Sequence, residues 1–148
     1  MTLEIAQQAV KWLKNNYKLN PKNDMFINFF GGEPLLQFDQ IIVPLVEENK
    51  EVNNLTFGIT TNGVLLDEDK VDFFYKNKID ILLSFDGVEE VQNIQRPGKN
   101  FNSYEKVLNN IPYLLLRFPN TTMRSTITKE SIPYVYETVM MAVELGFK

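Results

Sequence analysis

Residues 25–34, MFINFFGGEP, decide the fold class of this chain. The segment 25–30 is short and mostly apolar, and a pair of glycines ends it, so it predicts a buried β-strand. Residues 38–45 then place apolar side chains on one helical face. Pro44 lies inside that stretch and predicts a kink or a late helix start. The segment therefore reads as a strand, a glycine turn and a helix in succession.

The same succession occurs three more times along the chain. The later strands are expected at residues 55–60, 79–85 and 121–127, and the later helices begin at Asp67, Ser103 and Pro133. A polar loop is expected at residues 89–102, and Pro112 is expected to disturb the helix that begins at Ser103. An amphipathic helix over residues 2–17 and a breaker cluster at 20–24 come before the first strand.

Strands that alternate with helices in this way predict an α/β fold with a parallel sheet. We expect a partial (β/α) barrel of four βα units preceded by a helix. The chain begins on a helix and stops just after Gly146, a helix-capping residue. We therefore expect residues 1–148 to form a single domain that is truncated at both ends. Exposed sheet edges of that kind favour self-association.

Composition excludes several classes of function. The 148 residues carry a formal charge of −4 with scattered lysines, which argues against binding to nucleic acid. No apolar run is long enough to cross a membrane, and the first residues do not resemble a signal peptide, so we expect a cytoplasmic protein. The chain has no cysteine and no histidine. It therefore lacks thiol nucleophiles, imidazole bases and most transition-metal ligands.

Small polar residues and glycines follow the first two predicted strands, where ligands bind in parallel α/β sheets. Gly31 and Gly32 allow a ligand to approach the backbone closely, while Glu33 offers an acceptor. Taken alone, this segment is also explained by a tight turn with a solvent-facing Glu33. Asn62-Gly63 after the second strand is likewise a common turn pair.

The third strand ends in Ser84-Phe85-Asp86-Gly87. Alternation along a strand places Ser84 and Asp86 on the same side. A hydroxyl beside a carboxylate can hold a ribose or an amino-acid head group. The simpler interpretation is a serine in the strand followed by an Asp-Gly turn.

Together, the ordered motifs GGEP, TNG and SxDG resemble the signature of the radical S-adenosylmethionine superfamily. The resemblance is greatest to the SPASM branch, which includes anaerobic sulfatase-maturating enzymes and peptide maturases. Residues 91–97 after SxDG and residues 123–128 in the next strand are also similar to that branch, and the likeness extends over about residues 25–148. It implies a radical S-adenosylmethionine core that lacks its first and last strands.

The resemblance also implies a cofactor site and assigns no catalytic residue and no metal ligand to this chain. The implied cofactor-binding residues are Gly31, Gly32, Glu33, Pro34, Asn62, Ser84, Asp86 and Arg124. In the family, GGEP contacts the methionine amino group of S-adenosylmethionine. Arg124 suits the carboxylate because a guanidinium can bind it with two hydrogen bonds, although a surface salt bridge is an equal alternative. We interpret Arg96 as a structural residue of its loop.

The chain departs from the family at one decisive feature. The C-x3-C-x2-C loop that holds the [4Fe-4S] cluster is absent, and thiolates are the ligands such a cluster requires. We expect the loop to precede residue 1 in a longer protein. That protein is then expected to modify a peptide or protein substrate through a 5′-deoxyadenosyl radical, whereas this chain alone is inactive. The alternatives are a non-catalytic α/β module that binds a nucleotide or amino acid, and an unrelated barrel enzyme with phosphate-binding loops.

Reconstitution of this chain with iron and sulfide should give no brown four-iron chromophore, because it has no cysteine to hold one. The measurement is the visible absorption spectrum together with iron and sulfide content after desalting. Four irons bound per chain would refute the argument from the missing cysteines.

Overall fold

The computed structural model describes residues 1–19 and 24–148, so most of the expected breaker cluster at 20–24 lies outside the described residues. The described chain contains one four-stranded parallel sheet with the strand order β1-β2-β3-β4. The strands are β1 (Met25–Phe29), β2 (Leu55–Thr61), β3 (Asp80–Ser84) and β4 (Thr122–Arg124). The prediction of a parallel sheet in chain order is confirmed.

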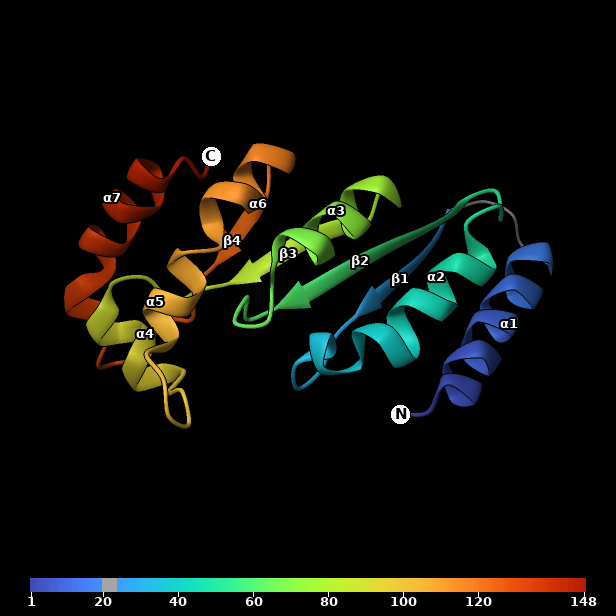
Figure 1. Cartoon of the computed structure of the whole chain (residues 1–148), viewed down its shortest axis with the longest axis horizontal. Coiled ribbons are helices and arrows are strands. Elements are labelled where there is room, and N and C mark those ends of the chain that lie inside the picture. Colours follow the sequence, from blue (N-terminus) through green and yellow to red (C-terminus); the bar gives the residue numbers. More distant parts are fainter. Residues whose placement is uncertain (20–23) are drawn as a thin grey trace.

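Helices separate the strands and follow the last one (Figure 1). They are α1 (Leu3–Leu19), α2 (Val43–Asn49), α3 (Glu68–Lys76), α4 (Glu89–Gln95), α5 (Ser103–Leu108), α6 (Ile111–Arg117) and α7 (Val135–Leu145). Short 3-10 turns at Pro34–Gln37 and Ile132–Tyr134, and a π-helical turn at Phe38–Ile42, complete the described elements. Pro44 falls in the first turn of α2, as the expected late start requires.

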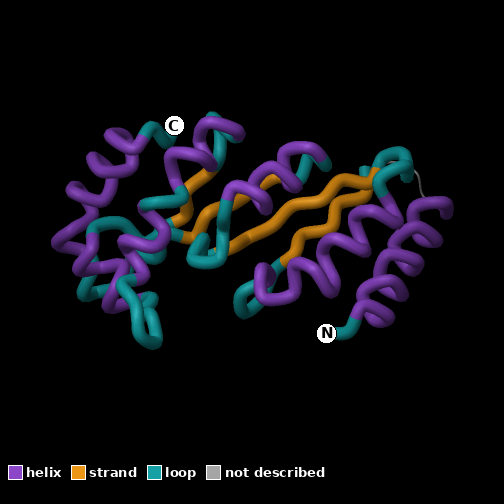
Figure 2. The backbone as a smooth tube through the Cα atoms, in the orientation of Figure 1, coloured by secondary structure: helices purple, strands orange, loops and turns teal. Residues whose placement is uncertain are grey.

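The two faces of the sheet differ in how they are covered. On β1, Ile27 and Phe29 pack against the helices, while Phe26 and Asn28 are exposed on the opposite face. The open face continues at Gly58 on β2, where a Cβ would lie 2.7 Å from the Phe26 ring. Helices therefore cover one face, and the other face stays open beside the aromatic ring. In Figure 2 the loops after β1 and β2 lie at the same end of the sheet.

The main core lies between the covered face and the helices. Its fully buried side chains include Phe74 of α3, Leu83 of β3 and Leu114 of α6. Helix α3 begins as expected: the side chain of Asp67 accepts a hydrogen bond of 2.9 Å from the backbone N–H of Lys70. The N-terminal end of α3 is thereby fixed immediately after the second strand-end loop.

The prediction of a polar loop over residues 89–102 is wrong, because residues 89–95 form α4. Glu89 and Glu90 occupy its first turn, where acidic side chains interact favourably with the helix dipole. Val91 and Gln92 are buried on its inner side. Two buried residues within seven gave too weak a periodic signal to be read as a helix.

The helix expected from Ser103 is divided in two. Helix α5 ends at Leu108, and α6 begins at Ile111 with Pro112 in its first turn. The N-cap of α5 is Asn102, whose side chain accepts a 3.2 Å hydrogen bond from the backbone N–H of Glu105. The expected break near the proline is therefore confirmed, and the cap moves by one residue.

Strand β4 is shorter than the expected segment 121–127. Beyond Arg124 the chain leaves the strand pattern, and the backbone N–H of Thr126 donates a 2.9 Å hydrogen bond to the Asp86 carboxylate. A side-chain acceptor thus takes the place of a backbone partner there. At the far end, Gly146 has a φ of 97°, which is the left-handed helix cap that the sequence predicted.

The remaining expectations concern the edges of the sheet and membranes. In the described sheet, β1 and β4 are the edge strands, so self-association through these edges stays a prediction. None of the described helices has the length and apolar character needed to cross a membrane.

Substituting Leu114→Ala should lower the free energy of unfolding by about 2–5 kcal/mol, because the side chain is 0% exposed in the core. Leu116→Ala on the same helix is the matched control. That leucine is 73% exposed, so its loss should change stability by less than about 0.5 kcal/mol. Urea unfolding followed by circular dichroism measures both, and equal effects would contradict the assigned core.

Candidate functional site

The strand-end loops meet around a small pocket of about 230 Å³. Its lining residues are Phe30, Gly31, Gly32, Thr60, Thr61, Asn62, Ser84, Arg96 and Arg124. Larger hollows lie on the open face of the sheet, at about 580 Å³, and between α1 and α2, at about 700 Å³. The small pocket gathers residues that end or directly follow each of the four strands. It is the candidate site.

Gly31 and Gly32 form one wall of the pocket and need the backbone freedom of glycine. Their φ angles are 100° and 54°, in the region that other residues rarely adopt. A Cβ added at either position would meet no atom within 4 Å. Glycine is therefore favoured at these two positions by the backbone conformation and not by a lack of space. The space beside their backbone is open to a ligand.

The Glu33 carboxylate joins the first loop to the second. One oxygen accepts hydrogen bonds from the hydroxyl of Thr61 at 2.7 Å and from the backbone N–H of Leu35 at 3.0 Å. The other oxygen accepts from the backbone N–H of Asn62 at 2.9 Å. Glu33 is thus turned into the protein rather than toward solvent, and it fixes the distance between the two loops.

Asn62 serves its own turn while it lines the pocket. Its side-chain oxygen accepts a 3.0 Å hydrogen bond from the backbone N–H of Val64. The neighbouring Gly63 has a φ of 76°, and a Cβ there would lie 2.6 Å from Leu83. The simple interpretation of Asn62-Gly63 as a turn is therefore correct, and the turn holds the Asn62 side chain at the pocket.

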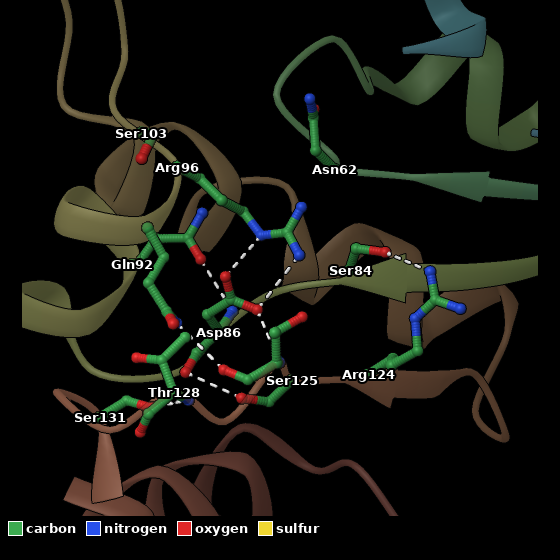
Figure 3. A network of polar contacts seen from close by, with 12 residues as sticks. Asn62, Ser84, Asp86, Gln92, Arg96, Ser103, Arg124, Ser125, Thr128 and Ser131 are labelled. Atoms are coloured by element: carbon green, nitrogen blue, oxygen red, sulfur yellow. Dashed lines mark hydrogen bonds and ion pairs between the residues drawn. The ribbon is translucent and has the colours of Figure 1, made fainter. Parts of the chain in front are cut away.

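Ser84 and Arg124 lie side by side on β3 and β4, where they are paired in register. A guanidinium N–H of Arg124 donates to the Ser84 hydroxyl at 3.3 Å, and its carbon lies 6.0 Å from the centre of the Phe30 ring. Both contacts are of the weak kind, a hydrogen bond to a neutral group and a cation–π contact at an exposed site. Figure 3 shows Arg124 approaching Ser84 from β4.

Asp86 is 2% exposed and forms the centre of a hydrogen-bond network (Figure 3). Its carboxylate accepts from Arg96 Nε at 2.7 Å and Nη2 at 3.2 Å, and from the backbone N–H of Thr126 at 2.9 Å. Its own N–H donates to Gln92 Oε1 at 2.8 Å, and its carbonyl accepts from the Ser125 hydroxyl at 3.1 Å. The network ties β3 to α4 and to the segment after β4.

Tyr104 packs beneath the third strand-end loop. Its ring stacks on Phe85 with the centres 5.8 Å apart, and its hydroxyl donates to the sulfur of Met141 at 3.8 Å. Burial raises the pKa of Tyr104 above its ordinary value of 10.0, and the nearby Glu89 and Glu90 raise it further. The phenol therefore stays protonated at neutral pH and contributes packing.

The structure divides the expected site residues into two groups. Five of them line the pocket: Gly31, Gly32, Asn62, Ser84 and Arg124. Glu33, Pro34 and Asp86 lie outside the lining: Glu33 and Asp86 hold the loops in place, and Pro34 begins the 3-10 turn that follows the first loop. Arg96 does both, since it lines the pocket and pairs with Asp86.

The sequence reasoning missed Phe30, Thr61 and Gln92. An aromatic residue that ends an apolar run is read as core, although Phe30 is 67% exposed. Gln92 was missed because α4 was expected to be a loop. The acidic pair that precedes Val91 was the available signal for that helix.

Metal ligands do not gather in the described residues. Residues 1–19 and 24–148 contain no group of three or more Asp, Glu, His or Cys side chains able to hold a metal ion. The full sequence has no cysteine. The donors at the pocket are hydroxyl, amide, guanidinium and backbone groups, which suit a polar organic ligand and not an iron–sulfur cluster.

Comparison with known proteins gives one family match. The family model described as the Radical SAM superfamily matches residues 4–142. An uncharacterized protein of Methanocaldococcus jannaschii is 32% identical over 154 residues, a match that covers 100% of this chain and 51% of that protein. A cysteine-type anaerobic sulfatase-maturating enzyme of Clostridium novyi is 33% identical over 119 residues, covering 77% of this chain and 31% of that enzyme.

Solved structures show the same fold. The structure of native anSMEcpe with bound AdoMet and Cp18Cys peptide has a TM-score of 0.76 at 23% identity and covers 86% of this chain. It confirms a partial-barrel arrangement of parallel strands with alternating helices. This chain corresponds to 37% of that structure and to about half the length of the Methanocaldococcus relative.

Glu33→Gln should lower the free energy of unfolding by about 1–3 kcal/mol, because one of the buried donors of the two loops would then face an amide N–H. Glu47→Gln is the matched control, since its pairing with Lys50 is exposed and should be worth at most about 1 kcal/mol. Urea unfolding compares the two variants. An unchanged stability for Glu33→Gln would show that its carboxylate does not hold the loops together.

Proposed function

The chain belongs to the Radical SAM superfamily, and we propose that it provides the S-adenosylmethionine-binding part of an enzyme that modifies a peptide or protein. The observation that carries the proposal is the convergence of the GGEP, TNG and SxDG loops with Arg124 around one pocket. A cytoplasmic location and a single domain that is part of a longer protein belong to the same proposal.

The superfamily uses S-adenosylmethionine and a [4Fe-4S] cluster. One-electron cleavage of S-adenosylmethionine to a 5′-deoxyadenosyl radical is the chemistry that these bound cofactors supply. This chain does not fit the cluster, because it has no thiolate to offer. We therefore assign the cluster ligands to a part of the longer protein outside these residues.

The pocket does fit the head group of S-adenosylmethionine, which carries an ammonium and a carboxylate. The open backbone of Gly31 and Gly32 can present carbonyl oxygens to the ammonium. Arg124, whose contacts among the described residues are the weak ones to Ser84 and Phe30, can donate two hydrogen bonds to the carboxylate. Asn62 and Ser84 add polar groups at the sides of the pocket. Glu33, Pro34 and Asp86 contribute by holding these loops in position.

Relatives support a peptide or protein as the substrate class. The names of two clostridial relatives describe sulfatase-maturating enzymes, and one solved relative contains a bound peptide. The open face of the sheet, with Phe26 and Asn28 exposed, leaves room beside the pocket for a substrate larger than a metabolite.

The absence of cysteine favours one other candidate, a non-catalytic module that binds a nucleotide or amino acid at the same loops. The coding sequence before residue 1 separates the two. A C-x3-C-x2-C motif there supports the enzyme, and its absence supports the binding module.

S-adenosylmethionine should bind this chain with a dissociation constant in the millimolar range, about −4 kcal/mol, because no iron is present to chelate its head group. Arg124→Ala should weaken binding about tenfold or more by removing a charge-assisted contact. Arg117→Ala is the matched control, since this arginine of α6 pairs with Asp72 away from the pocket. NMR chemical-shift titration measures all three. Submicromolar binding, or equal binding by the Arg124 variant, would contradict the proposed site.

A further inference from the structure

We propose that Arg96 is a positioning residue: by holding the Asp86 carboxylate, it keeps Arg124 free to bind an anionic group in the pocket. The inference rests on the proposed role of Arg124 as the cation that meets the ligand. It assigns a part in the same site to a residue that makes no proposed ligand contact. Both arginines line the pocket, but only Arg96 forms an ion pair there.

Asp86 is the residue that would compete with a ligand for pairing with Arg124. Ser84 pairs in register with Arg124, and Asp86 follows Ser84 by two residues, where it accepts hydrogen bonds from Ser125 and Thr126, the two residues after Arg124. Arg124 is exposed, so its long side chain is free to change rotamer. A carboxylate is a far better partner for a guanidinium than a serine hydroxyl or an aromatic ring. Arg124 nevertheless remains on Ser84 and Phe30.

The reason is that Asp86 is already saturated. Arg96 occupies both carboxylate oxygens, at 2.7 Å and 3.2 Å, and the backbone N–H of Thr126 occupies one of them at 2.9 Å. The carboxylate is also 2% exposed, so a new partner would have to displace an existing one. Its charge is balanced by a cation that approaches from α4 and not from β4 (Figure 3).

Helix α4 holds Arg96 in the position from which it pairs with Asp86. Arg96 caps the C-terminus of α4, where its backbone N–H donates to the carbonyl of Gln92 at 2.8 Å. The side chain of the same Gln92 accepts from the backbone N–H of Asp86 at 2.8 Å. One turn of helix therefore fixes both the backbone and the carboxylate of Asp86. Arg96 is pre-organised for its pairing, whereas Arg124 is not.

The consequence for the pocket is electrostatic. Its lining contains two arginines and no aspartate or glutamate. Arg96 is neutralised by Asp86, so Arg124 is the lining cation whose charge is left for a ligand. Loss of Arg96 would expose Asp86 as an unpaired carboxylate within reach of Arg124, and the two would pair. The pocket would then lose its anion-binding group although Arg124 itself is unchanged.

Four variants test this: Arg96→Gln, Asp86→Asn, the double variant with both changes, and Arg96→Lys. The first measurement needs no ligand. In Arg96→Gln, the Nε–Hε NMR signal of Arg124 should change its chemical shift, and the Hε proton should exchange more slowly with water, because the side chain pairs with Asp86. In the double variant it should return to the wild-type position, because asparagine is a poor partner for a guanidinium. An Arg124 signal that is unchanged in Arg96→Gln would overturn the proposal.

The second measurement compares S-adenosylhomocysteine with 5′-methylthioadenosine, which lacks the amino-acid head group. Arg96→Gln should weaken S-adenosylhomocysteine binding about tenfold or more and leave 5′-methylthioadenosine binding within about threefold of wild type. Asp86→Asn is the reference for the double variant, because both lack the carboxylate that ties the loops together; the two should bind S-adenosylhomocysteine within about threefold of each other. Arg96→Lys, which keeps a cation beside Asp86, should bind it within about threefold of wild type. A double variant that binds about tenfold more weakly than Asp86→Asn would mean that Arg96 touches the ligand itself, and would overturn the positioning role.

Thermal unfolding of each variant controls for loss of fold, since Arg96→Gln leaves a buried carboxylate without its cation. If that variant does not fold, the double variant still decides the question, because it has neither the carboxylate nor the arginine. If wild type binds both ligands equally, the proposed role of Arg124 in ligand binding fails. The NMR signal of Arg124 then still reports whether Arg96 keeps it from Asp86, so the two failures are distinct.

Discussion

The buried carboxylate of Asp86 is the interaction on which the rest of the site depends. A buried charge is costly unless it is paired and hydrogen-bonded, and the partners of Asp86, which is 2% exposed, come from two segments of chain. Arg96 and Gln92 arrive from α4, and Thr126 arrives from the segment after β4. Satisfying one anion therefore fixes the third and fourth strand-end loops relative to each other.

Glu33 plays the same part for the first and second loops. Its carboxylate accepts hydrogen bonds from the Thr61 hydroxyl and from the backbone N–H of Asn62. Like the Asp86 carboxylate, it is therefore hydrogen-bonded within the protein. Both acidic residues that the sequence motifs place near the pocket are thereby withdrawn from its lining. What remains at the surface of the pocket is glycine backbone, hydroxyl and amide groups, the Phe30 ring, Arg96 paired with Asp86, and Arg124. A site of that kind favours the carboxylate of an amino-acid head group.

The chain combines a pocket at its strand-end loops with a complete absence of cysteine. Members of the superfamily use S-adenosylmethionine and a [4Fe-4S] cluster. The matched relatives are about two to three times as long as this chain. One face of the sheet is open. Phe26 on that face and Phe30 at the pocket are both exposed.

The sequence by itself determined the four βα units, their parallel order and the loops that form the site. Apolar runs of strand length ended by Gly31-Gly32, Asn62-Gly63 or Asp86-Gly87 are local signals, and local signals survive in a single sequence. The sequence also predicted Ser84 and Asp86 on one side of a strand, but β3 ends at Ser84, and only Ser84 of the two lines the pocket.

Only the tertiary structure decided what each of these side chains does. Glu33 and Asp86 resemble ligand-binding carboxylates in the sequence, yet their donors lie 28 and 10 residues away, at Thr61 and Arg96. Helix α4 was missed for the same reason, because much of its stability comes from packing against Asp86 and the core rather than from its own seven residues. Pairings between distant residues depend on how the chain closes upon itself, and no local pattern encodes them.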